Sequence, residues 1–201
     1  VLVSHHPLIF SPLKKLDVST GTGKAVAFAL KRNIAVISMH TNWDSSPRGV
    51  NAAIAAALGL DSVSALVPSL SGAWGLGALG DVPSALTGRE LGQRICSVLN
   101  LSRLDLYGDP HRPVNRLALC GGSGGSLWSG AKAAGADAFF TSDLKYHERM
   151  DSLASGLILF AGDHGEVESF SLDAMARVVS EAFGFEPPIF RTMPAIPVII
   201  G

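Results

Sequence analysis

Blocks of apolar and polar positions alternate along the chain in a way that predicts strands and helices by turns. Uninterrupted apolar runs at residues 1–4 (VLVS) and 33–39 (NIAVISM) are typical of strands, and the second is expected to be buried on both faces. Helical spacing follows at residues 24–32 and about 49–58, where Gly59 suits a left-handed stop. This order favours a parallel sheet with helices beside it.

The middle of the chain departs from this alternation. Residues 61–70 and 72–80 predict two strands with no helix between them, and therefore an antiparallel portion. The sequence TGRE at residues 87–90 is a capping box that begins an amphipathic helix. Two further strands are expected at residues 104–107 and 115–120, on either side of the turn sequence GDPHRP.

The last third returns to strict alternation. Strands are expected at residues 116–120, 136–143 and 157–163, with helices at 126–135, 147–155 and 166–184. The predicted fold class is α/β: layered, mainly parallel sheets with flanking helices and a small antiparallel portion, in a two-lobed body. The length of the chain fits a single domain over residues 1–201.

Composition narrows the functional classes. Apolar residues make up 47% of the chain and charged residues 16%, which favours a surface covered in part by other subunits. The net charge of −1 and the scattered basic residues give no nucleic-acid footprint. No apolar run reaches the roughly 18–20 residues of a membrane span, and no signal peptide is found. Cys96 and Cys120 are interpreted as free, buried thiols of a reducing compartment, which predicts a cytoplasmic protein.

Histidine and acidic residues gather where four predicted strands end. These clusters are Ser4–His6, His40–Asp44, Thr141–His147 and Gly162–Glu168, and they hold five of the six histidines. Open α/β sheets bind ligands at the carboxyl ends of their strands. The coincidence of imidazoles and carboxylates there predicts a metal site, although a lone histidine is more often a structural residue.

The spacing within the clusters suggests how a metal ion would be held. His164 and Glu168 are four residues apart and share one helical face, whereas Glu166 is expected to complement the helix dipole. His5 and His6 can diverge at a strand end to serve two ions. With Asp44 these residues make five donors, too many for one open catalytic ion. Two ions fit if Glu168 bridges, and zinc, manganese, iron and nickel all remain open.

The motifs SHHPLIF, HTNWD followed by GVN, DAFFTSDLKYH and a closing H-x-x-x-E occur in order over nearly the whole chain. Together they resemble the NGG-interacting-factor-three family, whose members are dinuclear-metal hexamers often described as GTP cyclohydrolase I type II homologues. The resemblance implies a toroidal hexamer with paired metal sites facing an inner cavity. It implies metal ligation by His5, His6, Asp44, His164 and Glu168. It places His40, Asp143 and His147 nearby, either supporting the ligands or taking part in substrate binding or proton transfer.

The chain departs from the family pattern in three places. The family's segment before SHHP is expected to be missing. Asp163 stands where glycine is more common, so the local loop is expected to differ in shape. Apart from these departures, residues 66–116 are too short for the inserted central domain, which predicts a short-form member. The third departure is at Trp43. Trp43 replaces a smaller apolar residue, and it either narrows the cavity or packs.

The resemblance implies metal-dependent hydrolysis. Applied to GTP, this reaction opens the imidazole ring and releases formate, with His147 or His40 moving protons. A non-enzymatic metal-binding hexameric scaffold or regulator is the alternative, and a redox-active di-iron site is a third.

Two glycine-containing stretches resemble phosphate loops less well. GTGK at residues 21–24 lacks the full phosphate-loop pattern. GGSGG at residues 121–125 fits either an anion site or a tight turn that needs a positive φ.

Overall fold

The computed structural model describes residues 1–70, 72 and 74–191. The chain divides into two compact units, Val1–Trp43 and Asp44–Gly201. Residue 73 of the predicted strand 72–80, and residues 71, 73 and 192–201 of the predicted domain 1–201, lie outside the described residues. Among the residues that are described, no helix is both long enough and apolar enough to cross a membrane.

The first unit is built on a pair of parallel strands joined through one helix. β1 (Leu2–Ser4) pairs with β2 (Val36–Ser38), and α1 (Gly21–Lys31) lies between them in the sequence. The Thr20 hydroxyl caps α1 by accepting from the Gly23 N–H at 3.0 Å. α2 (Thr41–Asp44) follows β2 and reaches the first residue of the second unit.

The prediction of a long strand at residues 33–39 buried on both faces is wrong. β2 has three residues, and Ile37 is 48% exposed. The neighbouring Val36 lines an apolar groove with side chains of α1, so the helix covers only one face of the two-stranded sheet.

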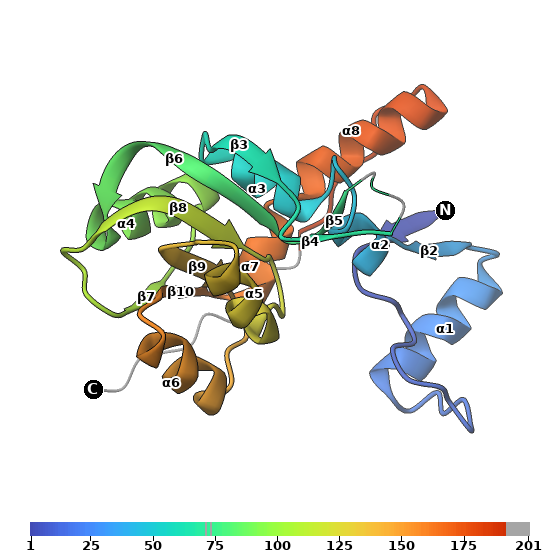
Figure 1. Cartoon of the computed structure of the whole chain (residues 1–201). Coiled ribbons are helices and arrows are strands. Elements are labelled where there is room, and N and C mark those ends of the chain that lie inside the picture. The colour runs from blue at the N-terminus through green and yellow to red at the C-terminus, as the bar shows by residue number, and fades with distance from the viewer. Residues whose placement is uncertain (71, 73, 192–201) are drawn as a thin grey trace. The chain divides into compact units, whose positions relative to one another are not determined.

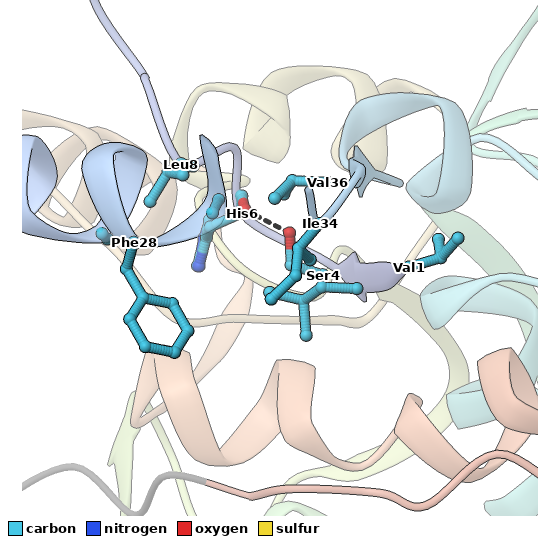
Figure 2. Close-up of a pocket in the computed structure, with 10 residues that line it drawn as sticks. Val1, Ser4, His6, Leu8, Phe28, Ile34 and Val36 are labelled. Atoms are coloured by element: carbon cyan, nitrogen blue, oxygen red, sulfur yellow. Dashed lines mark hydrogen bonds between the residues drawn. The ribbon is translucent and has the colours of Figure 1, made fainter. Parts of the chain in front are cut away.

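That groove runs along β1, β2 and α1 and has a volume of about 510 Å³ (Figure 2). Its wall includes Val1, Leu8, Phe28 and Ile34. Among the residues that line the groove, the Ser4 hydroxyl donates to the main-chain carbonyl of His6 at 2.8 Å. This bond fixes the turn that carries the two adjacent histidines.

The second unit contains a six-stranded sheet with the order β3-β6-β8-β9-β10-β7 (Figure 1). Its central strands β8, β9 and β10 are parallel, whereas β3, β6 and β7 pair antiparallel to their neighbours. A separate antiparallel pair is formed by β4 and β5. The strands are β3 (Asp61–Ser64), β4 (Val67–Pro68), β5 (Gly75–Leu76), β6 (Ala78–Thr87), β7 (Leu104–Tyr107), β8 (Pro113–Leu119), β9 (Ala138–Thr141) and β10 (Ile158–Gly162).

Helices pack on both faces of this sheet. On one face Leu79, Ala118, Phe139 and Leu159 form a buried cluster with Ala131 of α5 (Trp128–Ala133), and Leu153 of α6 (Tyr146–Ala154) packs against it. On the other face α4 (Gly88–Leu99) lies so close that a Cβ on Gly92 would stand 3.1 Å from the Phe160 ring. Burial on two sides explains why the central strands read as continuous apolar runs.

The layered α/β class is confirmed, with two differences of detail. The antiparallel portion is larger than expected, because the long strand β6 lies between β3 and β8 and is antiparallel to both. The helix expected over residues 166–184 is two helices, α7 (His164–Ser169) and α8 (Leu172–Phe183). α3 (Val50–Ala57), the capping box at Thr87 and the short 3-10 helix η1 (Gly125–Leu127) complete the described elements.

Candidate metal centre

The predicted donor residues lie just beyond the carboxyl ends of parallel strands. In the first unit, β1 leads into His5 and His6, and β2 leads into Met39 and His40. In the second unit, the parallel strands β9 and β10 lead into Asp143 and His164. Neighbouring parallel strands end at the same edge of a sheet, so each unit brings its own polar residues together.

Three histidines of the first unit form a compact group. The ring centroids of His5, His6 and His40 are 5.1–5.3 Å apart. One ring nitrogen from each lies within 4.8 Å of the others, close enough to hold a metal ion. His40, expected near the site in an uncertain role, therefore has a ring nitrogen at ligand distance from those of His5 and His6.

The ring of His5 is oriented by the main chain. His5 is 9% exposed, and its Nδ1 lies 2.9 Å from the Met39 carbonyl oxygen. Because a carbonyl oxygen only accepts, Nδ1 carries the proton and Nε2 carries the lone pair that a metal ion needs.

In the second unit His164 lies between two carboxylates. Its Nδ1 is 2.8 Å from Asp143 Oδ2, and its Nε2 is 2.8 Å from Glu168 Oε1. The second contact follows from the four-residue spacing on α7. Asp143, expected among the supporting residues, is thus placed to orient the His164 ring.

This arrangement favours positive charge on the imidazole when no metal ion is bound. The hydrogen bond with Glu168 is the largest cause, and a hydrogen bond with Asp143 adds to it against the opposing effect of burial. Together they raise the pKa of His164 to about 9. A proton and a divalent ion compete for the same nitrogen, so a rise in pH favours the ion.

Asp44 is held on the second unit by a buried asparagine. The Asn51 amide donates to the Asp44 carbonyl at 3.0 Å, and its oxygen accepts from the Gly121 N–H at 2.8 Å. Asn51 is fully buried, and it joins the turn that carries Asp44 to the glycine loop at residues 121–125. The motif GVN contains this asparagine, but its position in the sequence did not indicate this role.

Two carboxylates lie close enough to the Cys120 thiol to affect its pKa. Burial is the main cause that raises its pKa to about 12, and the negative charges of Asp44 and Glu168 add to it. Both carboxylates therefore act on the same buried thiol. The prediction of two buried thiols holds for Cys120, whereas Cys96 is partly exposed.

The glycine loop is shaped by crowding around these side chains. Gly122 has a φ of +74°, and a Cβ there would overlap Glu168 Oε1 and lie 3.3 Å from His164 Nε2. The Thr141 hydroxyl ties the loop to the end of β9, donating to the Gly122 carbonyl and accepting from the Gly124 N–H. The geometry thus accounts for the tight-turn reading of GGSGG.

The remaining expected residues are placed as follows. His147 is exposed, and its ring packs against Tyr146, 5.3 Å between centroids. Asp163 caps α7 by accepting from the Glu166 N–H at 3.0 Å. Glu166 accepts from the Ser102 N–H at 2.9 Å, a contact that the dipole interpretation did not foresee. Trp43 is buried.

The donor set suits a divalent metal ion. Imidazole nitrogens and carboxylate oxygens are the ligands that zinc, manganese, iron and nickel share. Fold and site together define a layered α/β protein with histidine and glutamate groups that could hold a metal ion.

The sequence matches the family described as Duf34/NIF3 (NGG1p interacting factor 3) over residues 1–192, and the chain belongs to that family. It is 40% identical over 152 residues to a Streptomyces coelicolor protein named GTP cyclohydrolase 1 type 2 homolog, covering 73% of this chain and 53% of that protein. It is 34% identical to a Nostoc protein of the same name, covering 88% of this chain and 68% of that one. The chain thus spans about half to two thirds of these relatives.

Solved structures show the same fold. Staphylococcus aureus protein SA1388 matches with a TM-score of 0.83 and 25% identity, over 90% of this chain and 73% of that chain. A Bacillus cereus protein related to NIF3 matches with a TM-score of 0.86 and 20% identity, over 99% of this chain and 82% of that one.

The crowding at Gly122 generates a first prediction. Gly122→Ala is expected to displace Glu168 and to change the ring ¹⁵N shifts of His164 in the metal-free chain, measured by NMR. Gly135→Ala is the matched control, because Gly135 has a φ of +80° but nothing within 4 Å of an added Cβ. Both variants lose about 1–2 kcal/mol of stability from backbone strain. Equal His164 spectra in the two variants would contradict the contact.

The two thiols generate a second prediction. In the folded chain at about pH 8, iodoacetamide is expected to modify Cys96 and to spare Cys120, because a thiol with a pKa near 12 stays protonated and only a thiolate attacks the reagent and displaces its iodide. Mass spectrometry of the Cys96→Ser variant isolates Cys120, and unfolding in urea should restore its reactivity. Rapid alkylation of Cys120 in that folded variant would show that the thiol is not buried beside Asp44 and Glu168.

Proposed function

We propose that this chain is a dinuclear metal-dependent hydrolase. The proposed ligands are His5, His6, Asp44, His164 and Glu168, with Glu168 shared between two divalent ions. The observation that carries the proposal is the pair His164–Glu168, whose donor atoms are 2.8 Å apart with Asp143 behind the imidazole. The three-histidine group of the first unit supports it independently.

Divalent ions at such a site supply Lewis-acid activation of water and of the bond under attack. The chain's own residues would orient the ligands and transfer protons. Asp143 orients the His164 ring, and the Met39 carbonyl orients His5. His40 or His147 is proposed to accept or return a proton at a ring nitrogen during hydrolysis. The name carried by the relatives from Streptomyces coelicolor and Nostoc supports GTP as the first substrate to test.

We also propose that the chain assembles as a homohexamer in the cytoplasm. Large apolar side chains of the first unit are exposed, among them Phe10 at 76% and Leu30 at 73%. Exposed apolar area of this kind favours association. The same surfaces would serve the alternative function, a metal-binding scaffold without catalysis.

The hydrolase proposal predicts that metal content and turnover fail together. His5→Ala and Glu168→Ala are expected to lose bound metal, measured by elemental analysis, and to lose hydrolysis of GTP and of simple phosphodiesters by at least about 100-fold. His111→Ala and Glu186→Ala are matched controls, because both residues are exposed and belong to no donor group described above.

The results of these assays distinguish the hydrolase from the metal-binding scaffold. Metal that binds in the wild-type chain without turnover of any of these substrates would favour the scaffold. Full hydrolysis by a metal-free His5→Ala, Glu168→Ala double variant would overturn the hydrolase.

A further inference from the structure

A polar cavity that Asp143 helps to line lies next to the His164–Asp143 pair. It has a volume of about 450 Å³, within the range of roughly 300–1,000 Å³ that holds small ligands. Its walls come from the glycine loop and the start of η1, and from the segment that joins β9 to α6 together with the first turn of α6. The polar side chains that line it are Ser123, Ser126, Ser142, Asp143, Lys145 and Glu148, here called the serine cavity.

The serine cavity shares a wall with the candidate metal centre. Asp143 lines the cavity and also contacts His164 through Oδ2 at 2.8 Å. A molecule held in the cavity would therefore be separated from a proposed metal ligand by one carboxylate.

The glycine loop packs closely against two other residues of the cavity wall. A Cβ on Gly125 would stand 2.6 Å from the Asp143 carbonyl oxygen and would overlap Glu148 Oε2. Only glycine lets the loop approach the Asp143 and Glu148 walls so closely. The sequence GGSGG thus allows two close contacts. Gly122 lets Glu168 approach the loop, and Gly125 lets Asp143 and Glu148 of the serine cavity do so.

One hydroxyl in the wall lacks a hydrogen bond. Ser142 is 9% exposed, and within the described part of the chain its Oγ is buried with no hydrogen-bond partner. Buried polar atoms in native proteins are nearly always paired, so an orphaned hydroxyl in a cavity wall points to a missing ligand or water.

The donors and acceptors of the wall indicate the ligand's chemistry. Lys145 only donates, the carboxylates of Asp143 and Glu148 only accept, and the serine hydroxyls do both. A phosphate accepts hydrogen bonds at neutral pH and would meet two carboxylates. A sugar hydroxyl can donate to a carboxylate and accept from an ammonium group at the same time.

We propose that the serine cavity binds a neutral, hydroxyl-rich group of the substrate, such as a sugar, beside the metal centre. This inference rests on the proposed function, because it assigns part of the substrate of the same site. Asp143 would then contact His164 with one oxygen and the bound hydroxyls with the other.

The test is an NMR titration of the purified ¹⁵N-labelled chain with D-ribose and, separately, with inorganic phosphate. Ribose is expected to shift the amide signals of Ser123, Ser126 and Ser142, and phosphate to leave them unchanged. Ser142→Ala should weaken ribose binding about fivefold through the loss of one hydrogen bond, without loss of thermal stability. Ser97→Ala is the matched control, because Ser97 is exposed on α4 and does not line the cavity.

Two further outcomes keep the result decisive. Absence of ribose shifts, or shifts with phosphate in place of ribose, would overturn the inference. Zinc titration of the same samples tests the metal site separately, because Ser142→Ala is expected to bind zinc as the wild type does. A chain that binds zinc but not ribose contradicts only this inference, and one that binds ribose but no metal contradicts only the hydrolase proposal.

Discussion

The hydrogen-bonded row Asp143–His164–Glu168 is the interaction on which the donor group of the second unit depends. A different element of the fold positions each of the three residues. Asp143 follows the buried strand β9, His164 follows β10, and Glu168 reaches back one helical turn along α7. The row forms because β9 and β10 are parallel neighbours and Asp163 caps the helix that starts at His164.

Close packing around that row explains the composition of the glycine loop. The loop follows β8, and the Thr141 side chain and the Ser142 N–H bind it to the neighbouring strand end. A side chain on Gly122 would displace a proposed ligand, and one on Gly125 would collide with the Asp143 carbonyl and with the Glu148 carboxylate that lines the serine cavity. The loop's small residues are therefore required by the side chains that pack against the loop. This packing alone explains why the sequence GGSGG resembles a phosphate loop.

Much of this arrangement could be predicted from the sequence. The apolar runs at residues 138–141 and 158–162 hold aromatic and aliphatic side chains, and residues 138–141 and 158–160 are buried, so their identity as strands was clear. The i, i+4 spacing of His164 and Glu168 predicts that they share one helical face, and α7 confirms it. The family was recognisable because four motifs occur in the correct order.

Other features depended on tertiary contacts that periodicity does not encode. β2 is short and half exposed because only one helix covers it. The part played by Asn51 rests on two hydrogen bonds to residues 7 and 70 positions away. The serine cavity joins loops that are distant in sequence, so neither its shape nor the buried Ser142 hydroxyl could be foreseen.

X-ray absorption spectroscopy of the purified, metal-replete chain tests the central claim most directly. The account predicts mixed imidazole and oxygen scattering, together with a metal–metal distance of about 3.5–4 Å, the separation of two ions that share a carboxylate. Its imidazole contribution should fall in His164→Ala. A spectrum with oxygen ligands alone and no metal–metal contribution would contradict a dinuclear centre built on these histidines.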